Sequence, residues 1–98
     1  MRANIEKFLT FCDNIGLSFS VPYRANFRDP NARFYLTFGT YHEVKIIEDN
    51  GSLTDFGFTD GNTPNEAIEN CIKELKGCYL QFQRCIDGEH VIRTAIFR

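Results

Sequence analysis

Between residues 4 and 15 the hydrophobic positions recur every three or four residues, as they do along one face of an α-helix. The residues of this stripe are Ile5, Phe8, Leu9, Cys12 and Ile15. Gly16 follows at a position where glycine commonly ends a helix. From Leu17 to Val21 the period changes to two, which predicts a strand whose odd-numbered side chains face the core. Pro22 then marks either the end of that strand or an edge strand.

The central part of the chain is rich in residues that favour strands. Residues 33–38 and 41–48 are predicted strands, and Gly39-Thr40 between them fits either a hairpin turn or a bulge. Asn50-Gly51 predicts a type I′ hairpin turn, because both residues accept the positive φ values that this turn requires. Residues 53–58 are then expected to return as the partner strand.

The clearest start of a helix lies at Thr63, with Pro64 at the first helical position and Glu66 completing a capping box. The apolar stripe that follows consists of Ala67, Ile68, Cys71, Ile72 and Leu75. Gly77 is a natural stop, although a helix that continues to about Tyr79 also fits. The alternation beyond Gly77 predicts two strands, over 78–86 and 90–97, joined by a hairpin turn at Asp87-Gly88.

The predicted order of elements is therefore α-β-β-β-α-β-β. A mostly antiparallel sheet with two helices on one face, an α+β two-layer sandwich, accommodates this order. The 98 residues suit one domain, 1–98, and the 43% hydrophobic content, with 10 Phe and 4 Tyr, excludes a disordered chain.

The net charge of -2 hides a strongly acidic middle part. Residues 43–74 carry eight acidic and two basic side chains, whereas residues 1–42 and 75–98 each carry a surplus of two positive charges. Such a region is either a solvated helix face with polar turns or a surface that docks on a basic partner. On the docking interpretation the candidate binding residues are Glu66, Glu69 and Glu74.

Arginines alternate with aromatic residues over residues 23–35. The candidate binding residues of this segment are Tyr23, Arg24, Phe27, Arg28 and Arg33. This mixture is typical of hot spots in protein interfaces, and it also suits stacking on nucleic-acid bases. A third interpretation is a long loop that Phe27 anchors while its arginines stay solvated.

The remaining residues give little sign of chemistry. Cys12 and Cys71 lie on the apolar stripes, so we expect buried, free thiols and a reducing compartment. His42 and His90 have no partners at zinc-ligand spacing, and no motif for catalysis or phosphate binding occurs. We therefore expect no enzyme, no catalytic residues, no metal and no cofactor. With no apolar run of membrane-spanning length and no signal-peptide pattern, the expected location is the cytoplasm.

Residues 44–75 resemble a recurrent small-domain pattern: a hairpin with a glycine in its turn, a strand, a short glycine-containing loop, and a helix that opens Thr63-Pro64-Asn65-Glu66-Ala67. This pattern is similar to the fold of HicB-type antitoxins, which is partly like a double-stranded-RNA-binding domain, and to small bacteriophage proteins. Unlike HicB antitoxins, this chain has no ribbon-helix-helix or helix-turn-helix segment after the pattern. Double-stranded-RNA-binding domains need a basic N-terminal end on their last helix to contact phosphates, and here that end is acidic, so RNA binding of that kind is not expected.

The resemblance and the acidic region together imply a small non-enzymatic module that binds proteins. Its concrete form is a phage-type accessory protein that inhibits a bacterial defence protein by surface docking, as anti-CRISPR proteins do. The expected partner is a bacterial host protein, rather than nucleic acid or a membrane. Two alternatives stay open: an antitoxin-like or nucleic-acid-binding module that uses residues 23–35, and a homodimer formed through the C-terminal strand.

Overall fold

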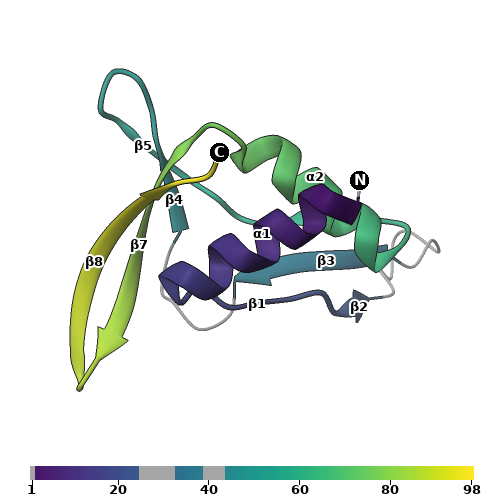
Figure 1. Cartoon of the computed structure of the whole chain (residues 1–98), viewed down its shortest axis with the longest axis horizontal. Coiled ribbons are helices and arrows are strands. Elements are labelled where there is room, and N and C mark those ends of the chain that lie inside the picture. The colour runs from purple at the N-terminus through teal and green to yellow at the C-terminus, as the bar shows by residue number, and fades with distance from the viewer. Residues whose placement is uncertain (1, 25–32, 39–43) are drawn as a thin grey trace.

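The computed structural model describes residues 2–24, 33–38 and 44–98 (Figure 1). These residues form two helices, α1 (Arg2–Ile15) and α2 (Pro64–Leu75), and antiparallel strands. The strands are β1 (Phe19–Ser20), β2 (Tyr23–Arg24), β3 (Arg33–Phe38), β4 (Val44–Ile47), β5 (Leu53–Asp55), β6 (Thr59–Gly61), β7 (Tyr79–Ile86) and β8 (Glu89–Ile96). The predicted α+β class and the order of its elements are confirmed.

The strands are divided between two antiparallel sheets. In the first sheet β3 pairs with β1 and β2 along one edge and with β6 along the other. The second sheet has the order β5-β4-β7-β8. Both helices lie above β1 and β3 in the view of Figure 1, so they share one face of the first sheet.

Strands β1 and β2 are two parts of one edge strand. Phe19 pairs with Phe38 and Tyr23 with Phe34, so the register does not change across Pro22. Pro22 lacks a backbone N–H, but its carbonyl still accepts a hydrogen bond of 3.0 Å from the backbone of Tyr35. The prediction that proline marks an edge strand is therefore confirmed.

Helix α1 ends where the glycine predicted. Gly16 has a φ of 72°, and the N–H of Leu17 donates to the carbonyl of Cys12 at 2.8 Å. This is the Schellman arrangement, in which a residue in the left-handed region satisfies the last helical carbonyls. The chain then enters β1 with Leu17 buried and Phe19 half-buried, as the alternation predicted.

The turn between β4 and β5 is not the predicted type I′ turn. Gly51 has a φ of 85°, but Asp87 is the one non-glycine residue of the described chain with a positive φ, so Asn50 stays in the ordinary region. The Asn50 side-chain oxygen accepts the N–H of Ser52 at 3.0 Å, which holds this conformation. Gly51 also donates to the carbonyl of Glu48 at 2.9 Å. The result is a longer hairpin loop that ends in a glycine bulge.

The predicted strand over residues 53–58 is wrong in its extent. It ends at Asp55, and the chain crosses to the first sheet, where residues 59–61 form β6 instead of the predicted loop. The predicted strand over residues 41–48 corresponds to β4, which spans Val44–Ile47. Gly39-Thr40 and His42 lie outside the described residues.

The predicted start of α2 at Thr63 is confirmed. The Thr63 hydroxyl accepts the N–H of Glu66 at 3.1 Å, and Pro64 occupies the first helical position. Leu75 is the last helical residue and Gly77 has a φ of 83°, so the alternative of a helix reaching Tyr79 is wrong. The hairpin after it turns at Asp87-Gly88, where φ values of 51° and 82° are those of a type I′ turn.

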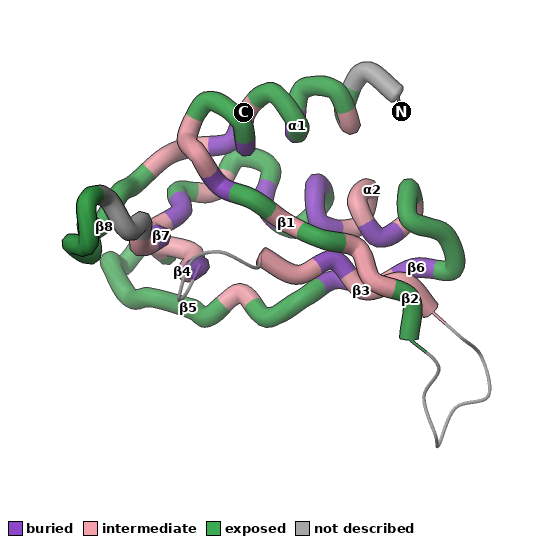
Figure 2. The backbone as a smooth tube through the Cα atoms, turned by 90° about the horizontal axis from the view of Figure 1, so that it is seen from below, coloured by how far each residue is buried: buried purple, intermediate pink, exposed green. Residues whose placement is uncertain are grey.

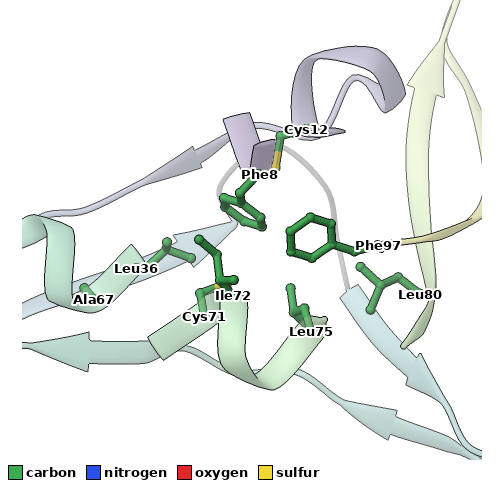
Figure 3. Close-up of a cluster of buried hydrophobic side chains, with 9 residues drawn as sticks. All are labelled: Phe8, Cys12, Leu36, Ala67, Cys71, Ile72, Leu75, Leu80 and Phe97. Carbon is green, nitrogen blue, oxygen red and sulfur yellow. The ribbon is translucent and has the colours of Figure 1, made fainter. Parts of the chain in front are cut away.

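The main hydrophobic core lies between the helices, β3 and the start of the second sheet (Figure 3). Its buried members are Phe8, Cys12, Leu36, Ala67, Cys71, Ile72, Leu75, Leu80 and Phe97. The rings of Phe8 and Phe97 meet edge to face with their centroids 5.5 Å apart. Burying one such large apolar side chain contributes about 1.5–3 kcal/mol, so this cluster is a principal source of stability.

Candidate protein-binding surface

Three contacts fix the short strand β6 against α2. The Thr59 hydroxyl donates to the carbonyl of Ala67 at 2.8 Å, and the Asn70 side-chain amide donates to the carbonyl of Asp60 at 2.7 Å. Gly61 comes so close to the helix that a Cβ atom there would lie 2.6 Å from the backbone nitrogen of Ala67. Because side chains alternate along a strand, this anchoring points the Asp60 side chain away from the core.

The outer face of the first sheet carries an aromatic pair. Leu36 is fully buried under the helices, so Tyr35 next to it faces the other way and pairs with Asp60 in the register of β3 and β6. The rings of Tyr35 and Phe58 meet edge to face with centroids 5.4 Å apart. Tyr35 packs against the ring of Phe58, yet Phe58 remains 57% exposed to solvent.

On the same face, an ion pair links Arg33, one of the predicted binding residues, to the acidic region. The guanidinium Nε of Arg33 lies 2.8 Å from the carboxylate of Asp60, and Arg33 also donates to the side chain of Asn62 at 3.4 Å. On the other sheet Lys45 and Asp55 form a looser pair at 3.5 Å. Two carboxylates of the acidic region therefore have a basic partner within the chain, and Arg33 is held beside β6 by Asp60 and Asn62.

A hollow of about 310 Å³ lies between β6 and α2. Its lining consists of Phe58, Thr59, Asp60, Asn70, Lys73 and Glu74. We call these residues, together with the supporting Tyr35, the β6–α2 surface. An exposed aromatic ring, two carboxylates, an ammonium group and an amide thus surround one depression.

The three predicted glutamates do not form a single cluster. Lys73 lines the hollow beside Glu74 and also a second hollow of about 130 Å³, which contains Glu69. Glu69 and Glu74 therefore lie on opposite flanks of the exposed side of α2, with Lys73 between them. Glu66 is half-buried in the first turn. The acidic β4–β5 turn projects from the upper left of Figure 1, at a distance from α2 along the long axis.

The other predicted binding residues gather at one end of the first sheet. Tyr23 is 62% exposed and its ring meets that of Phe34 at 5.1 Å. Arg24 is exposed and pairs with Arg33 across β2 and β3. In Figure 2 this end of the sheet is seen from below, with β2 and β3 side by side. Phe27 and Arg28 lie outside the described residues.

The sequence analysis missed Tyr35, Phe58 and Asn70 as surface residues. The alternation from Phe58 to Gly61 was the available signal, since Thr59 and Gly61 are buried whereas Phe58 and Asp60 are not. That signal covers only three strand residues, so it is too short to be distinguished from a loop.

The two buried thiols are chemically inert near neutral pH. Burial, helped by the nearby charge of Asp13, raises the pKa of the Cys12 thiol from 9.0 to about 12. Burial also raises the pKa of Cys71 well above its usual range, with Cys12 and Glu74 adding to the effect and a side-chain hydrogen bond with Thr59 opposing it. The thiolate is the reactive form, so neither residue can serve as a nucleophile. Their predicted burial is confirmed, and both are free, as is Cys78.

Within the described ranges, no group of three or more His, Cys, Asp or Glu side chains is arranged to hold a metal ion. Neither helix of the described chain has the length and apolar character needed to cross a membrane. Comparison of the chain with protein-family models, curated proteins and solved structures gives no match. The resemblance of residues 44–75 to HicB-type antitoxins stays a prediction.

Proposed function

We propose that the chain is a small non-enzymatic protein-binding module that docks through the β6–α2 surface. The observation that carries this proposal is the 57% exposure of Phe58, whose ring rests on Tyr35 at the rim of the hollow. An aromatic anchor surrounded by polar groups is the usual anatomy of a binding hot spot. Asp60, Lys73 and Glu74 supply that polar surround.

The charge of α2 indicates the kind of partner. Glu74 lines the hollow, Glu66 and Glu69 lie elsewhere on the same helix, and the segment from 43 to 74 carries a surplus of six acidic groups. Complementary charge speeds association and disfavours wrong partners, so a basic protein surface is the favoured target. The sequence resemblance adds the narrower version: a bacterial host protein of the cytoplasm, inhibited as anti-CRISPR proteins inhibit their targets.

The test compares two exposed aromatic residues. The chain is used to capture proteins from a bacterial lysate, a captured protein is identified and purified, and its affinity is measured for the wild type, Phe58→Ala and Tyr79→Ala. Tyr79 is 54% exposed but lies on the second sheet, so it is a matched control. Phe58→Ala should weaken binding at least about tenfold, as expected for a hot spot, and Tyr79→Ala should not. Equal effects of the two substitutions would exclude the β6–α2 surface.

A second pair of variants tests the charge. The triple variant E66K/E69K/E74K should lose affinity and stay folded, because none of the three side chains belongs to the core. A small fall in Tm is expected from Glu66, since a lysine in the first turn of α2 opposes the helix dipole. The variant E6K/D13K/D49K changes the net charge by the same amount at exposed positions outside α2 and should bind as the wild type does. If both triple variants bound equally well, the partner would not recognise the acidic helix.

The exposed neighbours Tyr23 and Arg24 favour one second candidate, a nucleic-acid-binding module. That candidate would use Tyr23, Arg24, Phe27, Arg28 and Arg33. Arg33 already has Asp60 as a counter-ion, which reduces its value for phosphate binding. A gel-shift series with DNA and RNA over rising salt distinguishes the candidates, because phosphate contacts make affinity fall steeply with salt. Absence of any shift at low salt would dismiss the nucleic-acid candidate.

A further inference from the structure

Strand β8 forms an edge of the second sheet. In the order β5-β4-β7-β8 it pairs with β7 along one side, over all eight of its residues, and no described strand pairs with its other side. Figure 1 shows that the β7–β8 hairpin extends away from the helices and from the first sheet. A regular strand at the edge of a sheet is a template for pairing with another strand.

The charges along β8 would be complementary to those of a second, antiparallel copy of the same strand. Glu89, Val91 and Arg93 alternate with their neighbours, so their side chains share one face of β8. Glu89 and Arg93 are both exposed, and they flank Val91 at equal distances along the strand. If two copies of β8 run antiparallel about a two-fold axis at Val91, each Glu89 lies opposite the Arg93 of the other copy.

We propose that the occupant of this edge is a second copy of the chain, which pairs β8 with β8 about Val91 and joins the two sheets into one. Opposite charges directly across an antiparallel pair are stabilising, and like charges there are destabilising. The two-fold axis gives two such pairs, each between Glu89 of one copy and Arg93 of the other. A register centred on Arg93 would instead place two arginines opposite one another, so the charges select the register at Val91.

Two further observations fit this arrangement. Ile92 is 58% exposed, and on the other face of β8 it would lie diagonally across from the Ile92 of the second copy, so that both isoleucines lose contact with water. Arg93 borders an open hollow of about 290 Å³ beside Asn14 and Ile15 at the end of α1, which leaves room for a carboxylate of the second copy. The β6–α2 surface takes no part, so this inference is independent of the proposed function.

Sedimentation of the purified full chain over a wide concentration range tests the dimer. The wild type should dimerise, and Glu89→Arg or Arg93→Glu should each weaken the dimer about tenfold or more, since each places two like charges opposite one another. The double variant E89R/R93E restores both attractions and should return to within about threefold of the wild type. Asp49→Arg makes the same change of charge as Glu89→Arg, but on the exposed β4–β5 turn, and serves as the control.

Crosslinking tests the register. Residues opposite one another at Val91 would form a non-hydrogen-bonded pair, whose Cα atoms lie about 4.5 Å apart, within the range that a disulfide spans. Val91→Cys should therefore give a covalent dimer under mild oxidation that the unmodified chain does not give. A wild type that stays monomeric at every concentration would overturn the proposal. So would a dimer that is insensitive to both charge reversals, or one that crosslinks through Thr94→Cys and not through Val91→Cys.

Discussion

The side-chain hydroxyl of Thr59 donates a hydrogen bond of 2.8 Å to the backbone carbonyl of Ala67. Thr59 is 4% exposed, and Ala67 is fully buried in the first half of α2. This bond joins a strand of three residues to the helix that covers it. Together with the Asn70–Asp60 hydrogen bond and the close approach of Gly61, it holds the candidate binding surface in place on β6.

Replacing Thr59 by valine should lower the free energy of unfolding by about 1 kcal/mol. Valine nearly keeps the volume of threonine and removes its hydroxyl, and with it the hydrogen bond to Ala67, worth about 0.5–1.5 kcal/mol, and the weaker contact with the Cys71 thiol. Thr59→Ala should cost more, because it also leaves a cavity. Urea denaturation of the three proteins measures both differences. Equal stability of the wild type and Thr59→Val would show that the bond contributes nothing.

Gly61→Ala should destabilise the fold by about 1–3 kcal/mol, the usual cost of overpacking. The new Cβ would lie 2.6 Å from the nitrogen of Ala67 and 2.8 Å from the carbonyl carbon of Glu66, and backbone atoms cannot turn aside. Gly57→Ala is the matched control, since a Cβ at Gly57 meets no atom within 4 Å. Thermal unfolding should show a large fall in Tm for the first variant and almost none for the second. A similar Tm for both would mean that β6 can move off the helix.

The pair formed by Arg33 and Asp60 should contribute little to stability. Both side chains remain partly exposed, at 31% and 42%, and exposed ion pairs contribute about 0.2–1 kcal/mol. A double-mutant cycle with Arg33→Ala and Asp60→Ala should give a coupling energy in that range, and high salt should reduce it. A coupling energy that salt leaves unchanged would contradict a solvent-screened pair.

Alkaline conditions should weaken the fold through Cys12. Its pKa is 9.0 without the effects of burial and about 12 in the folded chain, so above pH 9.0 the unfolded state loses a proton that the folded state retains. The unfolded state then gains stability, and Cys12 alone should lower the free energy of unfolding by about 1.4 kcal/mol per pH unit between these pKa values. Cys71, whose pKa is also raised, adds a decline of the same sign. Below pH 9.0 this contribution does not change.

Urea denaturation at pH values on both sides of 9.0 measures this slope. Cys12→Ala should be less stable than the wild type at neutral pH, because it removes a buried atom, yet it should show a smaller decline at alkaline pH. Parallel declines of the two proteins would show that the Cys12 thiol is not protected from ionisation.

Local signals in the sequence predicted those elements that short-range physics determines. The Thr63 cap depends on residues one turn away, and the stop at Gly16 depends on a single left-handed residue. The Asn50-Gly51 turn was placed correctly, but its type was wrong, because Asn50 has no positive φ and its side chain accepts the N–H of Ser52. Competition between side-chain and backbone hydrogen bonds is not visible in a dipeptide pattern.

The features missed by the sequence analysis depend on contacts between distant residues. Whether Thr59 belongs to a loop or to a strand depends on β3, which pairs Leu36 with it. The ion pair between Arg33 and Asp60 depends on the same pairing. Glu69 and Glu74 are separated because they border two different hollows, and Lys73, which borders both hollows, lies between them. Periodicity indicates which face of a helix is polar, but it does not indicate how neighbouring elements divide that face.

The edge-to-face contact between Phe8 and Phe97 has a consequence for how the chain folds. The two rings come from opposite ends of the sequence, and both lie in the same buried cluster (Figure 3). Nearly all of the chain between them must be brought into a closed loop before that contact can form, and this costs conformational entropy early in folding. Antiparallel pairing of distant strands adds to the cost. Folding should therefore take milliseconds to seconds, roughly the range of small domains dominated by contacts between distant residues.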